Sequence, residues 1–91
     1  MLDKVKLALQ ISVETFDSEL TDLIDAAKTD LGIAGVSLPA TLDAICERAI
    51  TSYCCYHFEL EHGDGSKAER LKKAYDEQKA QLSMSTGYTV L

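Results

Sequence analysis

The chain has 91 residues, 46% of them apolar and 26% charged, and its formal net charge is −6. This length allows one domain and excludes two, and the apolar content excludes a disordered chain. The acidic balance argues against broad binding of nucleic-acid phosphates. No apolar run approaches the roughly 20 residues that span a bilayer, and the N-terminus has no small-residue cleavage site, so we expect neither a membrane span nor a signal peptide.

The spacing of the apolar residues predicts the first three helices. The first covers residues 2–9. The second begins within residues 15–17, and Gly32 ends it in a left-handed cap. After a loop that contains Pro39, the third helix runs over residues 41–60.

The fourth helix follows the turn-forming stretch "EHGDGS". Ser66 and Glu69 form a capping-box pattern, which predicts a helix start at Lys67. The predicted inner face of this helix holds Ala68, Leu71, Tyr75, Gln78 and Leu82. Residues 86–91, "TGYTVL", favour a strand but have no partner strand. We therefore predict an all-α fold, a small four-helix bundle-like single domain over residues 1–85 with a short extended C-terminal tail over residues 86–91.

The charge is unevenly distributed along this chain. Residues 1–66 carry four basic and twelve acidic side chains, whereas residues 67–91 carry five basic and three acidic ones. The basic residues of the fourth helix are Lys67, Arg70, Lys72, Lys73 and Lys79. Such charge runs on helices are more often solvated faces than phosphate-binding surfaces, so DNA binding is the less favoured interpretation.

The stretch "SYCCYHFELEHGDG", residues 52–65, contains two of the three cysteines and both histidines. Thiolates and imidazoles are the ligands that zinc prefers, which makes Cys54, His57 and His62 a candidate metal site. Adjacent Cys55 diverges from Cys54 on a helix, so the pair cannot chelate one ion. A fourth ligand is missing. We therefore favour a packed Cys54, a core-edge His57 and a solvated His62, with no metal and no cofactor.

One broad face of the third helix forms the predicted core stripe, at about 100° per residue. That face holds Leu42, Ile45, Cys46, Ala49, Ile50, Tyr53, Tyr56, His57 and Leu60. Cys54 lies at its margin, Cys55 points nearly opposite, and Phe58 lies off the stripe. On this interpretation Ile45→Ala costs about 2–5 kcal/mol, and Cys55→Ser costs under about 1 kcal/mol.

No pattern in the sequence indicates an enzyme. The Cys54–His57 pair has no evident orienting group or oxyanion donor. Gly63 and Gly65 lie in an acidic turn that lacks the Lys-Ser pair of a phosphate loop. The odd number of cysteines is a poor disulfide framework, so we expect the chain to fold in a reducing cytoplasm.

Several features indicate a subunit whose small core is supplemented by contacts with other subunits in an oligomer. The core is thin for a chain of this size, and Cys55 and Phe58 are predicted to lie outside it. The tail can satisfy its backbone groups by adding a strand to a partner. The predicted partner-binding residues are therefore Cys55, Phe58, Tyr88, Thr89, Val90 and Leu91.

The segments "LDKVKLALQI", "FDSELTDLIDAAKTDLGIAGV", "AITSYCCYHFE" and "YDEQKAQLSMSTGY" follow one another along the chain. In this order, and in length and helical layout, the chain resembles the head–tail connector proteins of tailed bacteriophages, also called head-completion adaptors. The resemblance covers nearly the whole chain and is carried by the combination of segments, especially "YDEQKAQLS" followed by a tail Tyr. The Cys54–Cys55 pair belongs to no pattern of that family.

The resemblance implies a structural subunit of the virion that is assembled in the host cytoplasm. It implies a ring of about a dozen copies docked beneath the portal protein, with a tail-side completion protein as a further partner. DNA would pass through the central channel without specific binding, and the acidic residues ahead of Ser66 could supply a wall that repels phosphates. The C-terminal segment would be a docking element.

Two other classes remain open at the level of sequence. One is a helical regulator or antitoxin-like module that uses the basic fourth helix on nucleic acid or on an acidic partner. The other is a thiol or metal site built on Cys54, His57 and His62. Loss of DNA binding on mutation of Arg70, Lys72 and Lys73 would support the first class, and stoichiometric zinc would support the second.

Overall fold

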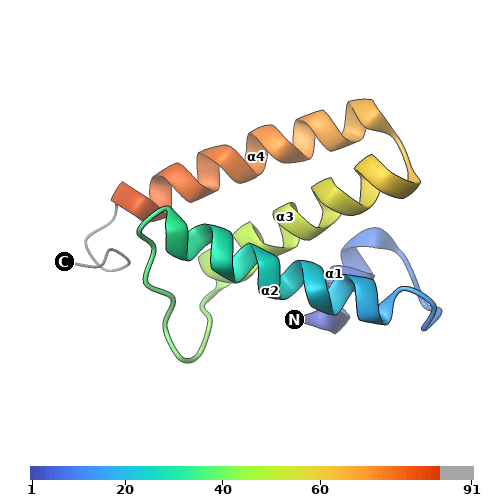
Figure 1. Ribbon diagram of the computed structural model, residues 1–91, viewed down its shortest axis with the longest axis horizontal. Coiled ribbons are helices and arrows are strands. Elements are labelled where there is room, and N and C mark those ends of the chain that lie inside the picture. The colour runs from blue at the N-terminus through green and yellow to red at the C-terminus, as the bar shows by residue number, and fades with distance from the viewer. Residues whose placement is uncertain (85–91) are drawn as a thin grey trace.

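The computed structural model describes residues 1–84 and folds them into four helices, with no strand within that part of the chain (Figure 1). This confirms the all-α, four-helix prediction. The predicted extended tail at residues 86–91 lies outside the described residues. The helices are α1 (Leu2–Leu9), α2 (Asp17–Ile33), α3 (Ala44–His62) and α4 (Gly65–Met84).

α2 passes through Gly32, where the sequence predicts its end. Two backbone bonds close the helix: the Val36 N–H donates to the carbonyl of Leu31 at 2.9 Å, and the Gly35 N–H donates to the carbonyl of Gly32 at 3.0 Å. Gly35 has a φ of 89°, so it holds the left-handed position of this Schellman motif. The prediction for Gly32 is wrong because the second glycine takes that conformation at no steric cost.

Aspartates set the starts of α3 and α4. Asp43 Oδ1 accepts the Cys46 N–H at 3.0 Å, and α3 begins at the next residue after this N-cap, later than predicted. Asp64 Oδ1 accepts the Ser66 N–H at 2.8 Å, and α4 begins one residue after Asp64, earlier than predicted. The capping-box prediction is wrong because Ser66 lies inside the helix that it was expected to cap.

α3 is the central helix and contacts each of the other three. In Figure 1, α4 runs along α3, α2 lies in front of it, and α1, drawn paler, lies behind. α2 and α4 are close at the end of α2 and diverge toward the turn between α3 and α4. The buried core cluster consists of Val5, Leu20, Ile24, Ala27, Leu31, Val36, Cys46, Ala49, Ile50, Cys54, Tyr75 and Leu82.

The predicted core stripe of α3 is partly wrong. Ile45 and Leu60, expected inside, are 46% and 59% exposed, whereas Cys55, expected outside, is 6% exposed. Cys54, placed at the margin, is fully buried. A single stripe fails because α3 packs against three helices, which bury more than one of its sides. The residues of the stripe that are buried as predicted are Cys46, Ala49 and Ile50.

The inner face of α4 agrees with the prediction. Ala68, Tyr75 and Leu82 are buried, and Leu71 and Gln78 are half-buried. Their spacing turns one side of α4 onto the core and leaves the charged residues of this helix on the other.

Candidate functional site

A groove of about 430 Å³ lies between α1, α3 and α4. α1 lines it with Lys4, Ala8 and Leu9, and α4 lines it with Lys67 and Leu71. The α3 residues that line it are Ala44, Glu47, Arg48, Thr51, Ser52 and Cys55. Most of these α3 side chains are small, so none of them fills the space between the three helices.

Cationic side chains surround this groove. Lys4 pairs with Glu47 across α1 and α3, and Lys67 Nζ lies 3.5 Å from a carboxylate oxygen of Glu59. Arg48 is exposed and makes no ion pair within residues 1–84. The groove is therefore a partly apolar surface with an excess of positive charge.

Cys55 forms part of this groove and is buried rather than exposed. Burial raises the pKa of the Cys55 thiol to about 11 and that of the Cys54 thiol to about 12. Both therefore stay protonated at neutral pH, whereas nucleophilic and metal-binding cysteines act as thiolates. The expectation that Cys55 points away from the core is wrong, and its contact with a partner stays a prediction.

The candidate ligands Cys54, His57 and His62 do not form a cluster. Among residues 1–84, the group of three potential ligands that the structure brings together is Glu19, Glu61 and His62. His62 Nε2 lies 2.9 Å from a Glu19 oxygen, so a hydrogen bond between the two side chains accounts for the arrangement. The sequence gives no signal for Glu19, because only the packing of α2 on α3 brings it to His62.

His57, a candidate metal ligand, and Phe58, a predicted partner contact, both pack against aromatic rings. The His57 ring lies 4.3 Å, centroid to centroid, from the rings of both Tyr53 and Tyr56. Burial lowers the pKa of His57, so the ring is neutral at neutral pH. Phe58 packs edge-on against Phe16 at 5.1 Å and is a partly buried residue packed against the core cluster, whereas the sequence placed it outside the core. Its role as a partner contact stays a prediction.

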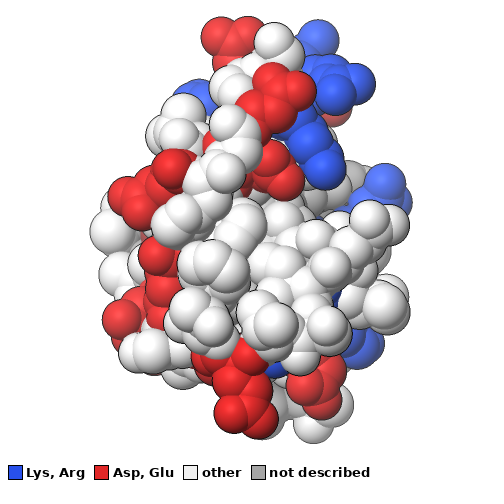
Figure 2. All heavy atoms as spheres, turned by 90° about the vertical axis from the view of Figure 1, so that its right-hand side faces the viewer, with Lys and Arg blue, Asp and Glu red and all other residues white. Residues whose placement is uncertain are grey.

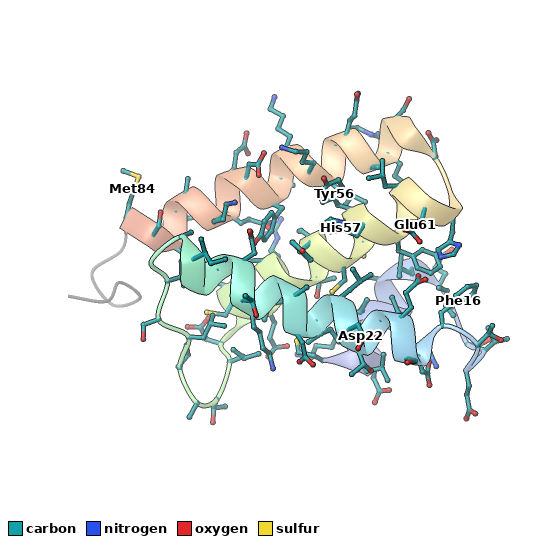
Figure 3. All side chains as sticks on the ribbon, viewed as in Figure 1. Phe16, Asp22, Tyr56, His57, Glu61 and Met84 are labelled. Carbon is teal, nitrogen blue, oxygen red and sulfur yellow. The ribbon has the colours of Figure 1, made fainter. Side chains whose placement is uncertain are left out.

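A second, smaller depression of about 170 Å³ lies at the seam between α2 and α3. We call its lining residues the acidic seam: Glu19, Leu23, His57, Leu60 and Glu61. Figure 3 shows His57 and Glu61 on the stretch of α3 that runs beside α2. On the face drawn in Figure 2, Asp and Glu side chains follow the left edge and the bottom, and most Lys and Arg side chains lie toward the right and the top. The charges of this face are therefore unevenly distributed.

A model of the family described as "Phage connector protein" matches residues 1–89 of this chain. The chain belongs to the phage connector family. The match confirms the resemblance to head–tail connectors. No curated protein and no solved structure matches the chain.

Membership of the connector family indicates a structural rather than an enzymatic role, a place in the phage virion and assembly with other head or tail proteins. Within the described residues, no helix combines the length and apolar character required to cross a bilayer.

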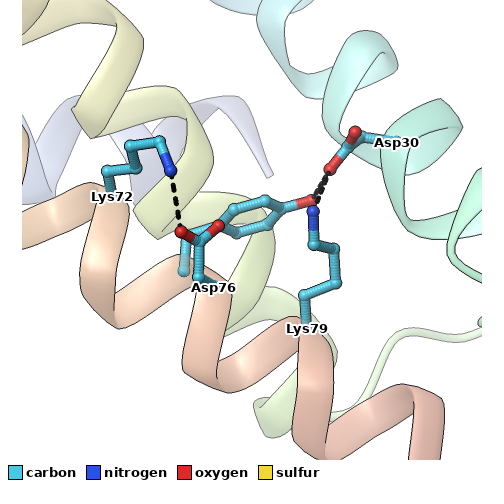
Figure 4. Close-up of polar contacts among 5 residues, drawn as sticks. Asp30, Lys72, Asp76 and Lys79 are labelled. Carbon is cyan, nitrogen blue, oxygen red and sulfur yellow. Dashed lines mark hydrogen bonds and ion pairs between the residues drawn. The ribbon is translucent and has the colours of Figure 1, made fainter.

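Three of the five basic residues of α4 pair with carboxylates of the same molecule, on α2, α3 and α4 itself. Lys72 pairs with Asp76 at 2.8 Å, and Lys79 lies 3.3 Å from Asp30 (Figure 4). Lys67 pairs with Glu59. Phosphate-binding helices present such lysines to the ligand instead.

Proposed function

We propose that this connector subunit forms a ring of about a dozen copies that docks beneath the portal and lets DNA pass between capsid and tail. The observation that carries the proposal is the family match over residues 1–89. A structural connector also agrees with the burial of Cys54 and Cys55, because their raised pKa values keep both thiols protonated at neutral pH and therefore weakly nucleophilic.

The surface charge supports a channel that does not hold DNA. Residues 1–66 carry an excess of eight negative charges, and Asp22 and Asp25 on α2 are exposed. A channel wall with such carboxylates repels the phosphates of DNA. DNA can therefore move through the channel without binding to its wall.

The ion pairs of α4 make the regulator alternative the weaker candidate. A helix that binds nucleic acid gains its affinity from lysines that replace the counterions of phosphates. In this chain three of the five basic residues of α4 face carboxylates of the same molecule. We therefore do not propose nucleic-acid recognition by α4.

Two measurements test the proposed function. Phage that lack this protein should produce DNA-filled heads that fail to join tails, and the protein supplied in trans should restore infectious particles. Electron micrographs of purified portal mixed with the protein should show an added ring on the portal. The proposal is wrong if particles without the protein join tails normally or if the protein is absent from the head–tail junction.

A further inference from the structure

The groove and the acidic seam carry opposite charges. In the groove, Lys4 pairs with Glu47 and Lys67 with Glu59, which leaves Arg48 as an exposed cation with no ion pair within residues 1–84. The seam contains Glu19 and Glu61 and no Lys or Arg. The Glu61 carboxylate lies 3.9 Å from His62 Nε2, but its side chain is 71% exposed, so a partner can reach it.

These two surfaces also lie on opposite sides of α3. Arg48, Ser52 and Cys55 follow the three- and four-residue spacing of one helix face and line the groove. His57 is two positions after Cys55 and therefore about 200° away around the helix, on the side of the seam. A molecule with complementary surfaces on opposite sides can bind the next copy in the same orientation.

Apolar groups accompany the charges on both surfaces. Leu60 is 59% exposed on the seam, beside Glu61. The groove presents Leu9, Leu71 and the side of Cys55 between its cations. A leucine flanked by a carboxylate therefore matches a partly apolar groove flanked by cations.

We propose that a second copy of this chain occupies the groove, with its Leu60 in the apolar part and its Glu61 facing Arg48. The inference rests on the proposed function and adds the surface through which the ring forms. Because the two surfaces differ, the contact is heterologous, and repetition of such a contact closes into a ring when the rotation permits.

Charge reversal tests this contact. Arg48→Glu and Glu61→Arg each place like charges at the junction, so each variant alone should associate at least about tenfold more weakly than the wild type. An equal mixture of the two variants should associate again, because every junction then pairs opposite charges. Sedimentation at low salt, with and without portal protein, measures the association, and circular dichroism checks the fold.

Matched controls use the same charge changes outside both surfaces. Lys73→Glu and Glu14→Arg alter exposed residues that line neither the groove nor the seam, and both should associate like the wild type. The proposal is overturned if either junction variant assembles normally, if their mixture fails to recover, or if the wild type stays monomeric up to about 1 mM, where even weak contacts are populated.

The two proposals fail in different ways. If charge reversal leaves the ring intact while the protein still occupies the head–tail junction, the interface is wrong and the function stands. If the variants behave as expected but the protein is absent from that junction, the interface stands and the function is wrong.

Discussion

Tyr75 connects three helices through one buried side chain. Its hydroxyl donates to Asp30 on α2 at 2.5 Å, and its ring meets Tyr53 on α3 at a centroid distance of 5.2 Å. Lys79 lies over the same ring and also contacts Asp30 (Figure 4). A residue of α4 therefore fixes the position of α2, which is distant in sequence.

We expect Tyr75→Phe to lower the free energy of unfolding by about 1–3 kcal/mol, since the bond that it removes has a charged acceptor. Urea denaturation measures this difference. Tyr56→Phe is the control: Tyr56 is half-buried and its hydroxyl makes no hydrogen bond within residues 1–84, so the change should stay within about 0.5 kcal/mol. Equal effects of the two variants would contradict the role assigned to Tyr75.

The same contact predicts a pH dependence of stability. The hydrogen bond from Tyr75, followed by the bond and charge of Lys79, holds the pKa of Asp30 below its ordinary value of 3.8. A carboxyl with a lowered folded pKa stabilises the fold above its unfolded pKa and loses this contribution as pH falls through the folded pKa. Stability should therefore fall below about pH 4, and less steeply in Tyr75→Phe than in the wild type. Identical acid profiles for both proteins would refute this prediction.

At the scale of the elements, α3 shows what an amphipathic pattern can and cannot predict. The helix itself, its approximate bounds and part of its buried face follow from apolar spacing. Its rotation does not, because the pattern assumes one buried face and α3 is contacted by three helices. Ile45 lines a groove of about 420 Å³ toward α4 whose other residues are mostly polar. The sequence around Ile45 does not indicate that these polar residues lie beside it.

The burial of α3 residues predicts a reversal of the effects expected from the sequence. Ile50 is fully buried, so Ile50→Ala should lower the free energy of unfolding by about 2–5 kcal/mol. Ile45 is 46% exposed, so Ile45→Ala should cost less than about 1 kcal/mol. Thermal and urea denaturation of both variants provide the measurement. A larger cost at Ile45 than at Ile50 would show that α3 is rotated relative to this structure.

At the scale of the whole molecule, the arrangement of charge depends on packing between distant segments. The family resemblance and the four-helix fold follow from the sequence. The groove and the acidic seam do not, because Glu19 meets His62, and Lys4 meets Glu47, across 43 positions of the chain. The composition shows an acidic protein, but only the fold shows which of its charged residues lie together.

The tail yields a prediction at this scale. Within residues 1–84 the buried core cluster extends from Val5 to Leu82. We expect deletion of residues 86–91 to leave helix content and the melting temperature nearly unchanged, because chain termini usually contribute little to the core. If the tail is the docking element implied by the family resemblance, the same deletion should abolish binding to the portal. Circular dichroism and co-sedimentation with portal protein test the two statements separately, and full binding by the truncated chain would place the docking surface elsewhere.

The short turn between α3 and α4 also has a kinetic consequence. α3 ends at His62 and α4 begins at Gly65, so the two helices form a hairpin whose pairing closes a very small loop. Helical proteins dominated by such local contacts fold in microseconds to milliseconds, whereas the assembly of subunits takes milliseconds to minutes and depends on concentration. Each newly made subunit therefore completes its own fold before it meets a partner, and the helices have little time to pair with those of another copy.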